Sequence, residues 1–180
     1  ISPSEYRNWI DFLKEEFIDQ SMLKERTKIL NGEVLHYILS FIGNLYQLDS
    51  ASLIKNALEK ARLEFPLIFD FDEFELTVNK LLQKKELKRF FEVGQALVFL
   101  EKEIVSSSGN TKRIDRLVVS SKEVWVIDYK SAPDEAANYK EQVREYMEIM
   151  KEIYPEKKIR GFLIYLDDLS SEEIGGLDKS

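Results

Sequence analysis

Two strand-like segments that follow each other closely, at 113–119 and 124–129, limit the folds that this chain can adopt. The second segment, VWVIDY, is almost wholly apolar, which is typical of a central strand covered on both faces. Because a tight connection joins the two segments, they are expected to pair as antiparallel neighbours. The sequence therefore predicts a sheet whose middle strands are buried beneath helices.

Ionisable residues stand inside and beside these apolar segments. Asp115 lies in the first, Asp128 lies in the second, and Lys130 follows it. Charges in such places are costly to bury unless they are paired or bind a ligand. Asp128 and Lys130 are two residues apart and so share one face of their strand. Asp115 can lie close to Asp128 across an antiparallel ladder, so we expect three ionisable groups in one small area.

Two converging carboxylates form a suitable site for a hard divalent cation such as Mg²⁺. A lysine beside such a metal suits chemistry on a phosphodiester, so these residues favour a metal-dependent nuclease. In the structural alternative, Asp115 forms a plain ion pair with Arg113 or Arg116. Asp128 then pairs with Lys130, and the chain is an α/β interaction domain that catalyses no reaction.

Hydrophobic spacing changes along the chain from helical to strand-like. Three strands joined by short turns, followed by a helix and another strand, indicate an antiparallel meander and then a crossover. The expected fold class is α/β, with a central mixed β-sheet flanked by helices and a helical N-terminal cap. Helices are expected at 2–18, 30–48, 50–64, 71–91 and 135–153, and strands at 96–105, 113–119, 124–129 and 158–166.

A chain of 180 residues is long enough for one domain with a sizeable core. The expected domain has a mainly helical part at 1–92, a catalytic α/β core at 93–168 and a tail at 169–180. The chain starts with ISPSEY, without an initiator Met or a signal-peptide pattern, so we expect a fragment of a larger protein.

Composition excludes several kinds of site. The chain has no cysteine, which rules out disulfides, thiolate zinc sites and an iron–sulfur cluster held by its own cysteines. The lack of cysteine fits an intracellular, cytoplasmic protein. No apolar run approaches the roughly 20 residues needed to span a membrane, so no membrane partner is expected.

The net charge of −7 argues against nucleic acid as a partner, since basic patches normally supply the affinity. Acidic metal ligands contribute to that total, however, and the basic residues are unevenly spread. Their clusters are candidate contacts for a phosphate backbone, with a solvated surface as the alternative. The clusters are Lys80, Lys84, Lys85, Lys88 and Arg89; Lys112, Arg113 and Arg116; and Lys157, Lys158 and Arg160.

Four motifs follow one another along the chain: NGEVLHYIL at 31–39, IDRL at 114–117, VIDYKS at 126–131 and YKEQVREY at 139–146. Together they resemble the PD-(D/E)xK nuclease superfamily, and within it the RecB-type nuclease domain at the C-terminus of helicase–nucleases such as RecB and AddA. The resemblance implies a restriction-endonuclease-like fold. It also implies a metal-dependent (exo)deoxyribonuclease that acts in DNA repair and recombination.

The resemblance further implies a set of metal ligands. Mg²⁺ or Mn²⁺ is expected on His36, Asp115, Asp128 and the backbone carbonyl of Tyr129, with Glu103 as a further, outer ligand. Neutral imidazole coordinates a divalent metal, and among the ions that support nuclease chemistry Mn²⁺ suits it best. The alternative for the single histidine, which stands on a helix otherwise packed by aliphatic residues, is a residue of the core.

The catalytic residues implied by the resemblance are Asp115, Asp128, Lys130, Gln142 and Tyr146. Lys130 is expected to position the attacking water or to offset charge in the transition state. Gln142 and Tyr146, four residues apart on one helix face, are expected to contact the nucleic-acid backbone or to orient Lys130. Core packing is the alternative for this face.

The partner implied by the resemblance is DNA, either single-stranded or at a duplex end, delivered by a helicase domain or subunit. The acidic balance suggests that the domain does not hold DNA alone. A tethered neighbour raises the effective concentration of the strand without local basic charge. The alternative function is a nucleic-acid-binding or scaffolding domain of the same fold that does not cleave.

Overall fold

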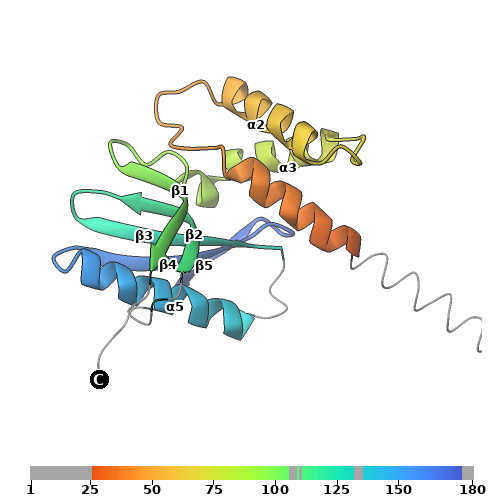
Figure 1. The fold of residues 1–180 in the computed structure, drawn as a ribbon. Helices are drawn as coiled ribbons and strands as arrows, with labels where there is room; N and C mark the ends of the chain where they lie inside the picture. The colour runs from red at the N-terminus through yellow and green to blue at the C-terminus, as the bar shows by residue number, and fades with distance from the viewer. Residues whose placement is uncertain (1–25, 106–108, 110, 132–135, 176–180) are drawn as a thin grey trace, which may run out of the picture.

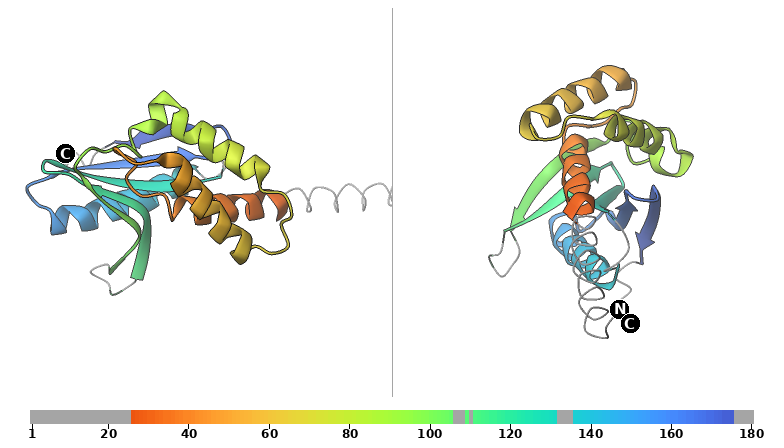
Figure 2. Two further views of the ribbon diagram at one scale, coloured as in Figure 1. Left: turned by 90° about the horizontal axis from the view of Figure 1, so that it is seen from above. Right: turned by 90° about the vertical axis from the view of Figure 1, so that its right-hand side faces the viewer.

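The computed structural model describes residues 26–105, 109, 111–131 and 136–175. The helix expected at 2–18 lies outside the described residues. The described chain folds into a five-stranded mixed sheet with helices on both faces (Figures 1 and 2). The expected α/β class, with a helical part that precedes the sheet, is confirmed.

The strands lie side by side in chain order, β1-β2-β3-β4-β5. An antiparallel meander is formed by β1 (Leu97–Val105), β2 (Thr111–Val119) and β3 (Glu123–Lys130). Helix α5 (Ala136–Ile153) then crosses over to β4 (Lys158–Tyr165), which pairs parallel to β3. The last strand, β5, returns antiparallel to β4. The meander, the crossover and the central position of β3 agree with the expectation from sequence.

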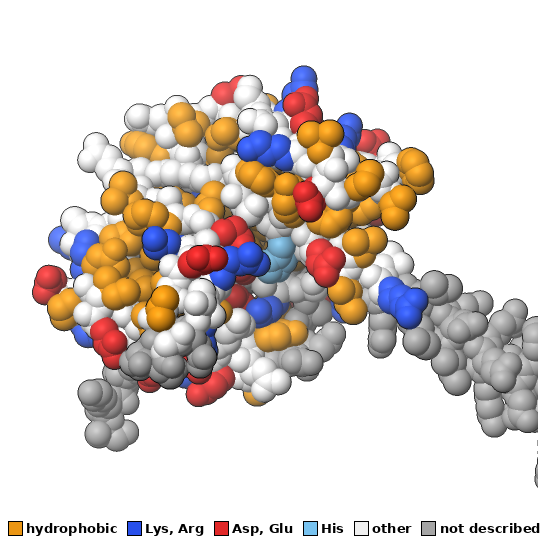
Figure 3. Space-filling view, viewed as in Figure 1, with side chains coloured by type: hydrophobic (Ala, Val, Ile, Leu, Met, Phe, Trp, Pro, Cys, Tyr) orange, Lys and Arg blue, Asp and Glu red, His pale blue; other side chains and the backbone are white. Residues whose placement is uncertain are grey.

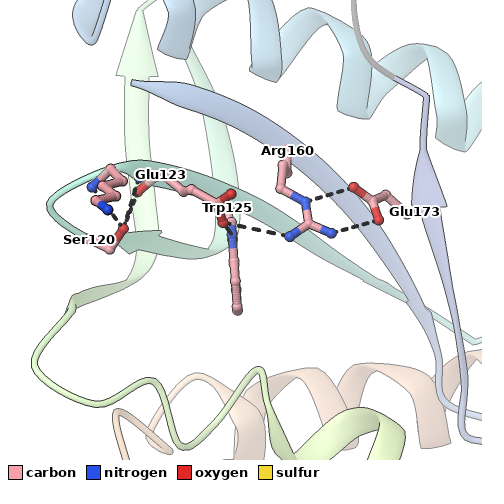
Figure 4. A network of polar contacts seen from close by, with 6 residues as sticks. Ser120, Glu123, Trp125, Arg160 and Glu173 are labelled. Carbon is pink, nitrogen blue, oxygen red and sulfur yellow. Dashed lines mark hydrogen bonds and ion pairs between the residues drawn. The ribbon is translucent and has the colours of Figure 1, made fainter. Parts of the chain in front are cut away.

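Strand β5 (Ser170–Ile174) corrects the expectation of a tail at 169–180. Its sequence, SSEEI, lacks the apolar alternation of a strand, although Ile174 is buried. The guanidinium of Arg160 on β4 donates two hydrogen bonds of 2.7 Å to Glu173 and lies 3.6 Å from Glu123 of β3 (Figure 4). The ladder with β4, the buried Ile174 and this cross-strand ion pair together place an edge strand whose sequence has little strand character.

The first described helix, at 26–39, ends well before the expected boundary of residue 48. The chain turns after Leu39, and the Ser40 hydroxyl donates to the carbonyl of Tyr37 at 2.7 Å. Helix α2 (Ser50–Glu64) has the expected bounds, and its N-cap Asp49 accepts a hydrogen bond from the backbone N–H of Ala51.

The helix expected at 71–91 is two helices, α3 (Asp72–Gln83) and α4 (Lys85–Lys88). Lys84 between them is extended, with a ψ of 120°. In an unbroken helix, the residues after Gln83 would keep the helical spacing of α3, and the apolar ones would have to fall on the same face as its buried stripe. The break allows the next apolar residues to enter the core, where three of them are fully buried: Leu87, Phe90 and Phe91.

Two hydrophobic cores lie on opposite faces of the sheet. One is formed with the helices that precede the sheet, and the other with α5 (Figure 1). Gly161 on β4 allows close packing of α5, because a side chain there would overlap Met147 and Val143. This packing sets the height of α5 above the sheet. None of the helices in the described ranges is long and apolar enough to cross a membrane.

Candidate functional site

Asp115 and Asp128 meet where the ladder between β2 and β3 ends. The last paired residues are Arg116 and Ile127, next to the two aspartates in the antiparallel register. Beyond this last pair, the N–H of Tyr129 donates to a side chain and not to the backbone of β2: Asp115 Oδ2 accepts this hydrogen bond at 2.8 Å. Asp128 is 2% exposed, so the fold brings two nearly buried carboxylates together.

Both carboxyl groups are electrostatically unfavourable in their ionised form. Burial raises the pKa of Asp115 to about 6, and the charge of Glu101 acts in the same direction. Burial also raises the pKa of Asp128 to about 6, with the charge of Asp115 as the second cause. Lys130 opposes both shifts without cancelling them. A bound cation would relieve the remaining repulsion.

Lys130 is held by a chain of side chains that starts on β3 and continues along α5. Its Nζ lies 2.8 Å from Asp128 Oδ2 and donates to Gln142 Oε1 at 3.0 Å. Gln142 Nε2 in turn donates to the hydroxyl of Tyr146 at 2.8 Å. The ring of Tyr139 lies 4.8 Å from the same ammonium. The two predicted polar residues of α5 therefore fix the direction of Lys130.

His36 approaches the carboxylates from the helix at 26–39. Its Nδ1 lies 3.7 Å from Asp115 Oδ2, and its ring meets that of Tyr129 edge to face at 5.7 Å. Burial is the main cause that lowers the pKa of His36, which favours the neutral imidazole that binds metals. A hydrogen bond from the imidazole to the backbone of Tyr129 raises the pKa of His36 and so opposes part of this effect. Figure 3 shows the pale-blue histidine in a hollow between acidic and basic side chains.

Gly32 accounts for the close approach of this helix. It is buried one turn before His36, and a Cβ atom at this position would overlap the hydroxyl of Ser131. Ser131 directly follows Lys130 at the end of β3. The glycine of the NGEVLHYIL motif, four residues before its histidine, thus allows the helix to lie against the strand end that carries the ionisable residues.

The fold does not bring Glu103 to this group. It is exposed on β1, where it stands opposite Arg113. Glu101 is the nearby carboxylate that sequence reasoning missed. Its Oε2 lies 2.7 Å from Arg113 Nε, and its charge acts on Asp115. Its φ of 50° is unusual for a residue with a side chain, and no sequence pattern indicates it.

Neither arginine proposed as a partner of Asp115 forms an ion pair with it in the described chain. Arg113 pairs with Glu101. Arg116 is fully buried and donates to three backbone carbonyls at 2.7 to 2.9 Å, those of Phe90, Ile42 and Gly43. The ion-pair interpretation is therefore wrong for Asp115, whereas Asp128 and Lys130 do form the pair that it expected.

The donor atoms fit a hard divalent cation in kind. Asp128 Oδ2 is buried and meets no hydrogen-bond donor in good alignment, although Lys130 Nζ is close to it. Together with Asp115, the His36 imidazole and the Tyr129 carbonyl, it offers oxygen and nitrogen ligands that Mg²⁺ or Mn²⁺ accept. Across the described ranges, no three His, Cys, Asp or Glu side chains are grouped so that together they could hold a metal ion in this arrangement.

Comparison with known proteins adds no identification, since no family model matches the chain and no curated protein is significantly similar to it. The chemical reading of the site therefore depends on its geometry. A pair of buried carboxylates with raised pKa values, beside a lysine of fixed direction, is typical of functional sites.

Proposed function

We propose that this chain is a divalent-metal-dependent DNA nuclease domain that hydrolyses phosphodiester bonds. The observation that carries the proposal is the convergence of Asp115, Asp128 and Lys130 at one end of the central strands. Burying two like charges destabilises a fold, so a purely structural role leaves this cost without a compensating benefit. A bound cation supplies the missing partner for the carboxylates, and a phosphate can then bind to that cation and to Lys130.

In the proposed site, His36, Asp115, Asp128 and the carbonyl of Tyr129 hold Mg²⁺ or Mn²⁺. When bound, the metal supplies Lewis-acid charge to the scissile phosphate and lowers the pKa of a nearby water. Asp115 also orders the end of β3, because its carboxylate accepts the N–H of Tyr129 and so fixes the peptide that joins Asp128 to Tyr129.

Lys130 has the second role. Its ammonium is directed by Asp128 on one side and by Gln142 on the other, so it loses little freedom when a phosphate arrives. From this position it orients the attacking water or offsets negative charge in the transition state. Gln142 and Tyr146 are positioning residues, since they act on the reaction through Lys130.

The biological setting is part of the proposal. A helicase domain or subunit would deliver DNA, single-stranded or at an end, during repair or recombination in the cytoplasm. The net charge of −7 supports delivery by a tethered neighbour over independent binding of DNA.

A second candidate function is a domain of the same fold that binds nucleic acid without cleaving it. Two observations favour it: no three of the described His, Asp or Glu side chains are grouped so that they could hold a metal ion, and Asp128 is ion-paired with Lys130. In that case the pair fixes the strand end and no hydrolysis takes place.

Cleavage of labelled linear single- and double-stranded DNA, with Mg²⁺, Mn²⁺ or EDTA, tests the proposal. We expect degradation that requires metal and is abolished in Asp128→Ala and strongly reduced in Lys130→Ala. Glu141→Ala is the matched control, because this carboxylate lies on α5 with its side chain 73% exposed. Retained cleavage in both site variants would contradict the assignment, and no cleavage by a folded, metal-loaded wild type would favour the second candidate.

A further inference from the structure

A cleft of about 720 Å³ opens beside His36, between the helical part and β1. Its walls include Ile29, Tyr37 and Phe65 from the helical part and Glu101 from the sheet. A smaller cleft of about 350 Å³ lies on the other side of the same histidine and shares Ile29 and Ser131 with the first. The two clefts therefore adjoin at His36, one of the candidate metal ligands.

The larger cleft has an aromatic wall. The rings of Tyr37 and Phe65 meet edge to face, with centroids 5.5 Å apart, and Tyr37 meets Phe41 in the same manner at 5.1 Å. Both lining rings are half-buried, so each is fixed in direction yet accessible from the cleft. Fixed aromatic rings in a concave wall are the surfaces on which flat apolar groups stack.

The charge of the larger cleft is unsuited to a phosphate backbone. Among the described residues that line it, Arg113 is the only lysine or arginine, and its guanidinium is already paired with Glu101. Glu33 adds a second carboxylate to the wall. A phosphate would be repelled here, whereas an uncharged aromatic ring would not.

The smaller cleft has the opposite character. It is lined by Lys28 and Lys130, with Tyr139 beside them. Lys28 pairs with Asp167 at 3.2 Å and Lys130 with Asp128 at 2.8 Å. Among the described residues that line this cleft, however, there is no Asp or Glu. One side of His36 therefore suits a phosphate, and the other side suits a base.

We propose that the larger cleft is a nucleobase pocket, which stacks the unpaired base of a nucleotide adjacent to the scissile phosphate on Tyr37 and Phe65. The inference rests on the proposed function for the position of that phosphate. It names the substrate class as single-stranded DNA, because a base inside a duplex is stacked and paired and would have to be flipped out to enter. Stacking tolerates every base, so the pocket confers no strong sequence preference.

Binding in EDTA tests the pocket without any cleavage. The affinities of the wild-type chain are compared for a short oligothymidine and for an oligomer of the same length made of abasic nucleotides, at one salt concentration. We expect at least about fivefold tighter binding of the base-bearing strand, since this is the lower end of what one stacked base contributes. Equal affinities for the two strands would overturn the proposal.

Three variants locate the effect. Tyr37→Ala is expected to lose the preference for the base-bearing strand, and Tyr37→Phe to keep it. Ile29→Ser removes an apolar wall at a residue that is 61% exposed, so it keeps the measurement available if Tyr37→Ala does not fold. Tyr46→Ala, exposed and outside both clefts, is the matched control. If Tyr37→Ala and Ile29→Ser both keep the wild-type preference for the base-bearing strand, the base does not bind in this cleft.

The two proposals fail separately in this design. The nucleobase preference is read in EDTA, so it survives if the chain binds nucleic acid but does not cut it. Metal-dependent cleavage that is equally fast on base-bearing and abasic strands would leave the nuclease in place and overturn the pocket.

Discussion

The Asp115 carboxylate accepts the backbone N–H of Tyr129 over 2.8 Å, and this bond joins two neighbouring strands where their ladder has ended. The same carboxylate lies 3.7 Å from His36, so one side chain connects the central sheet with the helical part. Asp115 thus bonds to the backbone of β3 and lies beside the helical part, which a surface ion pair would not do. The following predictions use this arrangement.

Removing one charge from the carboxylate pair should stabilise the metal-free protein. Asp128→Asn keeps the shape and leaves Lys130 its bond to Gln142. Because the pKa of Asp128 is raised despite the lysine, the ionised carboxylate costs stability at mildly alkaline pH. We expect the free energy of unfolding in EDTA to rise by roughly 1–3 kcal/mol. Urea denaturation measures it, and a loss of stability would show that the ion pair outweighs the repulsion.

The pH dependence of that stability has a defined sign. A folded-state pKa of about 6, above the unfolded value of 3.8, means that the folded protein binds more protons between these values. Stability of the metal-free protein should therefore fall as pH rises through this window. Urea denaturation of the wild type and of Asp128→Asn in EDTA isolates the effect, because the variant should have the shallower slope. Equal slopes would refute the cause.

A bound divalent metal should offset the loss of stability that the two carboxylates cause at a pH at which both are ionised. Mn²⁺ is expected to raise the midpoint of thermal unfolding of the wild type above pH 7, since a ligand that binds only the folded state stabilises it. Asp128→Asn should show a much smaller shift. The readout requires no DNA, so it separates metal binding from cleavage. A shift of equal size in the variant would move the metal to another site.

Arg116 is a second link between the sheet and the helical part. Its replacement by Met leaves three buried carbonyls without their donor, those of Phe90, Ile42 and Gly43. We expect a loss of about 3–5 kcal/mol of unfolding free energy for Arg116→Met. Arg144→Met, whose pair with Glu141 is exposed, should change stability by less than about 0.5 kcal/mol. Urea denaturation of the two variants gives the comparison.

The central sheet could be predicted from sequence because its order follows from local signals. Apolar runs with short connections specify the meander, and the helix at α5 specifies the crossover. Strand β5 could not be predicted, since SSEEI has one apolar residue, and the strand is placed by its ladder with β4 and by the contact of Glu173 with Arg160. The role of Glu101 could not be predicted either, because its position is also not specified by its local sequence. Its place beside Asp115 depends on a positive φ that a Leu-Glu-Lys sequence does not indicate.

The carboxylates, the lysine and the single histidine could be identified as candidates because ionisable residues are conspicuous in apolar segments and in motifs. Their distances depend on packing that no motif encodes. Arg116 is the clearest case. Its neighbour Asp115 suggested an ion pair, yet its side chain points to the opposite face of the strand and binds backbone carbonyls.

The close contact between Gly32 and Ser131 gives a test of how His36 is positioned. A methyl group in Gly32→Ala would overlap the Ser131 hydroxyl. If this hydroxyl stays in place, the helix moves, and His36 with it, away from Asp115. We expect Mn²⁺ affinity to fall by about tenfold, as for the loss of one supporting contact of a metal ligand. Ser131→Ala alone should change little.

The double variant Gly32→Ala/Ser131→Ala then decides the mechanism. Removing the hydroxyl makes room for the methyl group, so metal affinity should return towards that of Ser131→Ala. Such non-additivity is expected only for residues in direct contact. If the double variant binds Mn²⁺ as weakly as Gly32→Ala, the glycine acts through the helix backbone and not through its contact with the strand end.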